Sequence, residues 1–300
     1  MKQKYLFLIA AVFIVIVAIV LLQRPPRKAQ PWSLLLSTTN KQGRSNVDYT
    51  PLVTKIQDYL STVPDGQFGI YFHDLHSGHI FGINEQLPIT AASTIKVPLV
   101  LYLNELVAAG QEDLSTPISY VKERHYQGGN GVLRYDGRED YPYSLRVLSN
   151  LAITISDNIA TSMLINHLGR QNFINYMVGL GGKTVYPGGK NVTTAADMGL
   201  YMKEVLDFAK RSPQLGHRIL DDMAHSIFHT GIPGLLPPEI TVAHKEGDLD
   251  GIANDVGIVF HDHPYILTVL SIGIADLDEG FSHIAAISKL VFDYQSQLHR

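Results

Sequence analysis

A serine and a lysine three residues apart, Ser93 and Lys96, could together perform nucleophilic chemistry. They stand at the start of an apolar segment, residues 97–109, which we expect to form a buried helix. On a helix, residues three apart lie on the same face, so the lysine amine would lie next to the serine hydroxyl. Burial lowers the pKa of a lysine amine, and a neutral amine can take the serine proton. We therefore predict that Ser93 is a nucleophile and that Lys96 activates it.

The Ser-x-x-Lys pattern is weak evidence by itself, because about one copy is expected by chance in a chain of this length. This chain contains a second copy, from Ser119 to Lys122. It follows Pro117 and is followed by charged residues and glycines, not by an apolar helix. We interpret it as the chance copy, and the first copy needs support from elsewhere in the chain.

Two further motifs give that support. Ser156-Asp157-Asn158 lies at the break between two predicted helices, and Lys245-Glu246-Gly247 ends a predicted strand. In this order the three motifs are the signature set of penicillin-recognising serine enzymes, and the chain resembles the class A β-lactamase family. The segments 153–160, 164–169 and 254–259 are similar to that family as well, and the resemblance extends from about residue 49 to residue 300.

The resemblance implies a role for each reactive side chain. Ser93 would attack a carbonyl carbon and become acylated, while Lys96 draws off or relays its proton. Ser156 and Lys245 would pass a proton to the departing nitrogen, and Lys245 would also attract an anionic substrate. These four residues are the predicted catalytic set.

The predicted substrate-binding set is Asn158, Glu246, Gly247 and Asp248. Asn158 would bind the substrate amide and steady the lysine of the first motif. The oxyanion hole would consist of two backbone N–H groups, those of Ser93 and Asp248, and such a pair can contribute several kcal/mol in a transition state. Asp157 is expected to be buried and structural.

The chain departs from the family in two places. A class A β-lactamase clears its acyl-enzyme with a glutamate on a loop after the second motif, but residues 181–194 contain no acid. The family also has Thr or Ser where this chain has Glu246. A carboxylate there would repel the carboxylate of a β-lactam, by about 1–4 kcal/mol at about 4 Å. We therefore expect slow deacylation, and faster reaction with such substrates after Glu246→Thr.

Strand patterns occur at both ends of the domain, with helical patterns between them. Apolar periodicity predicts a helix over 49–63, a hairpin over 68–72 and 79–83, and strands over 240–245, 255–260 and 265–274. Further helices are expected over 144–155, 158–168, 173–180, 195–210, 215–228 and 281–298, and no strand between 117 and 212. The fold class is α+β, a two-lobed β-lactamase/transpeptidase-like fold. An antiparallel sheet flanked by the terminal helices would pack beside an all-helical lobe.

The N-terminus carries an uninterrupted apolar run of 17 residues, Leu6 to Leu22, between basic residues. Such a run just spans a bilayer core of about 30 Å. We expect a transmembrane signal-anchor over 1–23, a linker over 24–46 and the catalytic domain over 47–300. A cleaved secretory signal and a buried helix are the alternatives. The resulting prediction is a single-pass protein of the cell membrane with an extracytoplasmic catalytic domain.

Composition excludes several kinds of site. The formal net charge is −4 with no basic block, so we expect no nucleic-acid partner, and the absence of cysteine excludes disulfides and a thiol nucleophile.

His225 and His229 lack a third ligand nearby, so we expect both to be surface histidines, and we expect no metal and no cofactor. A monomer is expected.

The predicted function is that of a serine hydrolase forming an acyl-enzyme with a β-lactam or a related peptidoglycan-like amide or ester. Two alternatives stay open. The chain could be a cell-wall amidase or esterase, or a non-hydrolytic domain that binds or senses cell-wall material or β-lactams.

Overall fold

The computed structural model describes residue 32 and residues 47–298 of the 300-residue chain. The predicted signal-anchor and almost all of the predicted linker lie outside the described residues. None of the helices in the described part is both long enough and apolar enough to span a bilayer. The division into anchor, linker and catalytic domain therefore stays a prediction.

A five-stranded antiparallel sheet forms one lobe, with strand order β2-β1-β9-β8-β7. Every residue of β8, and most of β9, is buried. A strand covered on both faces has no need of polar alternation, which explains the nearly continuous apolar runs in the sequence. The bounds are β1 (Gln67–Asp74), β2 (Ile80–Ile83), β7 (Thr241–Leu249), β8 (Ile252–Phe260) and β9 (Tyr265–Ile272).

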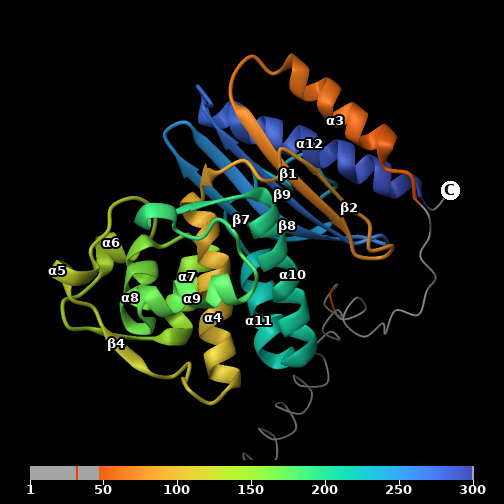
Figure 1. The fold of residues 1–300 in the computed structure, drawn as a ribbon. Helices are drawn as coiled ribbons and strands as arrows, with labels where there is room; N and C mark the ends of the chain where they lie inside the picture. The colour runs from red at the N-terminus through yellow and green to blue at the C-terminus, as the bar shows by residue number, and fades with distance from the viewer. Residues whose placement is uncertain (1–31, 33–46, 299–300) are drawn as a thin grey trace, which may run out of the picture.

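The terminal helices, α3 (Thr50–Thr62) and α12 (Leu277–Gln297), lie together on one face of this sheet (Figure 1). Their apolar sides bury Leu52, Ile56 and Ile284 against the sheet. On the opposite face, α10 (Ala195–Arg211) packs on β1, β8 and β9. The sheet is therefore covered by helices on both faces, and the sequence predicted the terminal helices on one of them.

The second lobe is almost entirely helical (Figure 1). Its long helices are close to those predicted, but four short strands lie where none was expected, because strands of two or three residues leave no periodic pattern in the sequence. The strands are β3 (Ile89–Thr90), β4 (Pro117–Ser119), β5 (Pro142–Ser144) and β6 (Val192–Thr193), of which the first pairs with the last and β4 with β5. The helices are α4 (Lys96–Ala108), α5 (Lys122–His125), α6 (Leu133–Asp136), α7 (Leu145–Thr154), α8 (Asn158–Leu168), α9 (Arg170–Gly179) and α11 (Pro213–Ala224).

Helix α4 joins the two lobes. It leaves the sheet lobe after β3, contacts α7, α8, α9, α10 and α11, and is buried along most of its length. An apolar helix with little amphipathic character is expected at the centre of a core. This position brings the start of α4 to the junction between the lobes.

Candidate active site

Ser93 lies on a tight 3₁₀ turn, Ala92–Ile95, immediately before α4. The sequence predicted an α-helix here. Residues three apart also share one side of a 3₁₀ turn, so Ser93 and Lys96 remain on the same side of the chain, and both line the same pocket. Ala92 adopts a φ of +49°, a left-handed conformation that costs free energy in a non-glycine residue. The turn presents Ser93, which is half-buried, to a pocket of about 900 Å³.

The Lys96 amine links the first motif to the second. It donates to the Ser156 carbonyl oxygen (2.7 Å), to Ser156 Oγ (3.0 Å) and to Asn158 Oδ1 (2.7 Å). All three ammonium protons of Lys96 thus have acceptors on the Ser-Asp-Asn motif.

Burial, reinforced by the nearby Lys245 ammonium, lowers the pKa of Lys96 to about 7. The Lys96 side chain is only 3% exposed. A lysine with this pKa is neutral in a substantial fraction of molecules at neutral pH and can then accept a proton.

The second motif is held by a strained residue and a capping carboxylate. Ser156 is buried and has a φ of +57°. Asp157, also buried, caps α8 by accepting from the Ala160 N–H (2.9 Å) and accepts from the Leu133 N–H (2.9 Å). The structural role predicted for Asp157 agrees with these contacts.

Asn158 is tied to the glycine-rich loop that follows the second Ser-x-x-Lys copy, residues 128–131. Its side-chain Nδ2 donates to the Gly128 carbonyl (2.7 Å), and its backbone N–H donates to the Asn130 carbonyl (3.0 Å). A Cβ at Gly129 would lie 2.5 Å from Asn158 Nδ2, and one at Gly131 2.3 Å from Asp157 Cγ. The cluster of glycines in residues 128–131 was the signal that this loop packs against the second motif.

Lys245 is completely buried on β7, and its ammonium is close enough to Lys96 to lower the pKa of the Lys96 amine. Its amine donates to the Glu246 carbonyl (2.6 Å) and lies 5.4 Å from the centre of the Phe228 ring. Burial lowers the pKa of Lys245 to about 8. Phe228, which sequence reasoning missed, supplies a cation–π contact to this lysine.

Gly247 is the point of closest approach between β7 and the Ser93 turn. A Cβ on Gly247 would stand 2.7 Å from the Ser93 nitrogen and 2.9 Å from the Thr94 nitrogen. Only glycine allows the two backbones to meet here. The strand also continues to Leu249 instead of ending at the motif, so Asp248 is a strand residue at the pocket.

Glu246 lies elsewhere than the sequence analysis expected. Its carboxylate accepts from the Gly231 N–H (2.8 Å) and the Thr230 N–H (3.0 Å), is 5% exposed, and is not among the residues lining the pocket. Burial and the nearby Asp255 carboxylate raise the pKa of Glu246. The alternation of side chains along β7 turns Glu246 away from the face that carries Lys245 and Gly247.

This placement reverses the expectation for Glu246→Thr. We now expect no faster reaction with carboxylate-bearing β-lactams. The free energy of unfolding should fall by about 2 kcal/mol, because the buried Gly231 N–H and the partly buried Thr230 N–H lose their acceptor. Urea unfolding and acylation rates with benzylpenicillin measure both quantities. Faster acylation at unchanged stability would restore the repulsion hypothesis.

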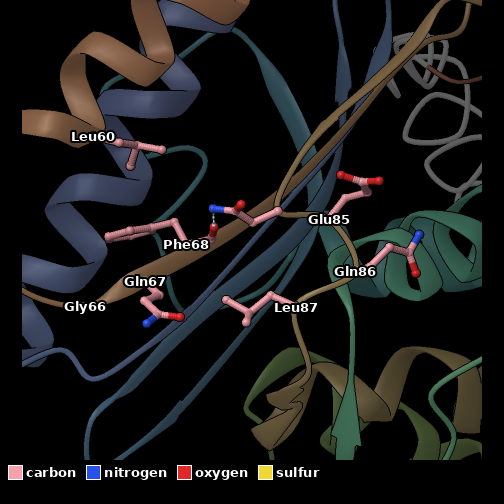
Figure 2. Close-up of a pocket in the computed structure, with 8 residues that line it drawn as sticks. Leu60, Gly66, Gln67, Phe68, Glu85, Gln86 and Leu87 are labelled. Atoms are coloured by element: carbon pink, nitrogen blue, oxygen red, sulfur yellow. Dashed lines mark hydrogen bonds between the residues drawn. The ribbon is translucent and has the colours of Figure 1, made fainter.

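Four of the eight predicted site residues line the pocket: Ser93, Lys96, Asn158 and Asp248. Ser156 and Lys245 lie buried beneath it, 1% and 0% exposed. A separate hollow of about 500 Å³ beside β1 is lined by residues such as Leu60, Phe68 and Leu87 (Figure 2). The Asn84 amide donates to the Phe68 carbonyl there (3.2 Å). It contains none of the motif residues.

The loop between α9 and β6 supplies no carboxylate to the pocket. Tyr186, with a φ of +45°, and Asn191 are its lining residues. The next acid, Asp197, accepts from the Lys183 N–H (3.0 Å) and the Thr184 N–H (2.7 Å) and is buried. Its carboxylate therefore holds the beginning of the loop and does not line the pocket.

The histidines His225 and His229 are not on one helix, because α11 ends at Ala224, before both of them.

In the described part of the chain, one group of three buried residues could hold a metal: His244, Glu246 and Asp255. Asp255 already accepts from the Ile232 N–H (2.7 Å) and contacts His244 Nδ1 (3.0 Å). Burial alone would lower the pKa of His244, but Asp255 and Glu246 outweigh it and raise that pKa. The group is accounted for as an internal hydrogen-bonded network.

A model of the beta-lactamase enzyme family matches residues 51–295. The chain belongs to the beta-lactamase enzyme family. Both the resemblance and the two-lobed fold inferred from the motifs are thereby confirmed, and family and fold together indicate a serine hydrolase. No match was found among curated proteins.

The solved structures agree with this assignment. PBP-A is 28% identical with a TM-score of 0.76, over 83% of this chain and 97% of that one. A PBP-A mutant, solved as an acyl-enzyme complex with penicillin G, is 27% identical with a TM-score of 0.77, over 83% of this chain and 97% of that one. A beta-lactamase from Sphaerobacter thermophilus shares the fold, with 24% identity and a TM-score of 0.74 over 84% of this chain and 99% of that one.

Proposed function

We propose that the protein reacts through Ser93 with β-lactams or related cell-wall-type amides or esters and forms an acyl-enzyme that breaks down slowly. The observation that carries the proposal is the Lys96 amine, buried next to the Ser93 turn with a lowered pKa and bonded to Ser156 and Asn158. The penicillin G complex of the 27%-identical PBP-A mutant supports it.

The proposed acylation moves one proton and exchanges one bond. Ser93 Oγ attacks the carbonyl carbon while its proton passes to neutral Lys96. The backbone N–H groups of Ser93 and Asp248 stabilise the oxyanion. When the C–N bond breaks, Lys96 passes the proton it took from Ser93 to Ser156 Oγ, which accepts from its amine, and Ser156 gives its own proton to the nitrogen. The nearby Lys245 ammonium favours this release of the proton from Lys96. The product is an ester on Ser93 and an amine, which departs from an open-chain amide and stays attached in the opened ring of a β-lactam.

Slow deacylation follows from the composition of the pocket wall. Hydrolysis of the ester needs a water and a group that takes its proton. The loop residues that line the pocket, Tyr186 and Asn191, offer no carboxylate. The carboxylates on the wall belong to Asp248 and Asp250, at the end of β7 and beyond.

The alternatives differ in what happens after binding. A cell-wall amidase or esterase would turn over its own substrate through Ser93 while retaining β-lactams as stable adducts. A binding or sensing domain would use the same pocket without turnover.

Labelling with a fluorescent penicillin and nitrocefin hydrolysis separate these possibilities. We expect a labelled band that is absent in Ser93→Ala and little nitrocefin hydrolysis. Rapid nitrocefin hydrolysis would contradict slow deacylation. The absence of any Ser93-dependent label would contradict the acyl-enzyme and favour the alternative of a non-hydrolytic binding domain.

The acylation rate should depend on pH through both buried lysines. Lys96 must be neutral, so the rate should rise as pH passes about 7. Lys245 must be protonated, so the rate should fall above about 8. We expect a narrow bell-shaped dependence of the second-order acylation rate constant on pH. Because Lys96 and Lys245 interact, the two apparent pKa values of this profile belong to the pair of lysines together. A flat profile between about pH 6 and 9 would contradict these roles.

We also propose that residues 1–23 anchor the protein in the membrane with the catalytic domain outside the cytoplasm. The support is the apolar run from Leu6 to Leu22 and a substrate class found outside the cell. Retention of the full chain in membranes washed with alkaline carbonate is expected, and release into the soluble fraction would contradict the anchor.

A further inference from the structure

The pocket beside Ser93 continues along helix α8 well beyond the motif residues. Asn158, Ser162 and Asn166 mark successive turns of α8, and all three line the pocket. Asn158 bonds the Lys96 amine, whereas Asn166 stands about 12 Å further along the helix axis. The pocket therefore extends from the reacting end to a second, distal end.

The acid-free loop leaves this face of α8 uncovered. Of residues 181–194, only Tyr186 and Asn191 line the pocket, while Thr161, Ser162, Ile165 and Asn166 of α8 are part of its wall. Asn166 Nδ2 also lies 3.4 Å from the Arg124 carbonyl oxygen, which places Arg124 next to this distal end.

Two arginines, Arg124 and Arg170, give the distal end a positive charge. Arg170 is held in place, because its Nη2 donates to the Gly189 carbonyl (2.9 Å) and its guanidinium lies 4.9 Å from the centre of the Tyr186 ring. The Arg124 guanidinium makes no hydrogen bond or ion pair within the described part of the chain, so it is available to a ligand.

The opposing charges lie on the other wall. The two carboxylates that line the pocket, Asp248 and Asp250, both come from the sheet lobe at the end of β7 and in the turn after it. The residues that the helical lobe contributes to the pocket include no acid. An anion at the distal end would therefore meet Arg124 and Arg170 with no carboxylate on the same wall.

We propose that this distal end is a subsite for a carboxylate on the acyl arm of the substrate, the part that stays attached to Ser93. The inference rests on the proposed acylation and names the substrate class more closely: a peptide-like amide or ester whose acyl arm ends in an acidic group. Guanidinium groups recognise carboxylates in a planar, two-bond geometry that a neutral amide cannot reproduce.

The test compares two penicillins that differ only at the end of the acyl arm. One is 6-aminopenicillanate acylated with adipate, which ends in a carboxylate, and the other ends in the corresponding primary carboxamide. We expect the carboxylate compound to acylate Ser93 about tenfold faster, since two partly exposed ion pairs contribute modestly. The ratio of the two acylation rates should approach one in the double variant that carries both Arg124→Gln and Arg170→Gln. It should stay unchanged in Arg146→Gln, which removes an exposed arginine on α7 outside the pocket.

Two results would overturn the subsite: equal rates in the unaltered protein, or a preference that survives in the double variant. If neither compound acylates Ser93, the proposed acylation fails, and the subsite is judged separately by calorimetry on Ser93→Ala. There the carboxylate compound should still bind about tenfold more tightly than the carboxamide, and equal affinities would reject the subsite.

Discussion

Replacing Lys96 with methionine is expected to lower the second-order rate constant for acylation of Ser93 by about a thousandfold. Methionine keeps most of the buried volume but cannot take the serine proton, and a positioned general base contributes about 10²–10⁴-fold. It also removes the donors to Ser156 and Asn158. Stopped-flow or quench measurements with a fluorescent penicillin give the rate, and thermal unfolding shows whether the variant remains folded.

The chain contains its own control for that experiment. Lys122 belongs to the second Ser-x-x-Lys pattern and is exposed on the short helix α5. Lys122→Met should leave the acylation rate unchanged. A comparable loss in both variants, or a loss below about tenfold in Lys96→Met, would contradict the base role assigned to Lys96.

Gly247→Ala is expected to lower the acylation rate by about a hundredfold without altering any reactive side chain. The added methyl group would stand 2.7 Å from the Ser93 nitrogen, so the Ser93 turn or β7 must shift. A displacement of about 1 Å at a reacting group can cost about 10²-fold. The rate is measured on the folded fraction, and the melting temperature should fall as well.

Gly179→Ala provides the matched substitution. Gly179 is the last residue of α9, and an added Cβ would meet nothing within 4 Å. Alanine there should leave acylation unchanged and favour the helix. An unchanged rate in Gly247→Ala would mean that the close approach of β7 does not position Ser93.

The sequence predicted the elements whose apolar periodicity is long and regular. The predicted range 158–168 coincides with α8, and the terminal helices differ from the prediction by a few residues. The paired strands β3 and β6 are two residues each, too short for a periodic signal. The α11 boundary was placed too late because the apolar residues Ile227 and Phe228 continue the pattern beyond the helix end at Ala224.

At the site, the motifs predicted which side chains come together but not which way every one of them points. Lys96, Ser156 and Asn158 are brought together as expected. Glu246 is not in the pocket, because the N–H groups of Thr230 and Gly231 bind its carboxylate elsewhere. The sequence could not predict this position, because residues 230–231 carry no recognisable motif. Arg124 and Arg170 were missed for the same reason, since isolated arginines are common on surfaces and only the fold places these two in one pocket.

The central claim is that Ser93 forms an acyl-enzyme more readily than it breaks one, and intact-protein mass measured over time after mixing with benzylpenicillin tests it most directly. We predict a mass increase of one penicilloyl group that forms within minutes, persists after the free drug is removed, and is absent in Ser93→Ala. An adduct that never appears, or one lost as fast as it forms while benzylpenicillin is consumed, would contradict the claim.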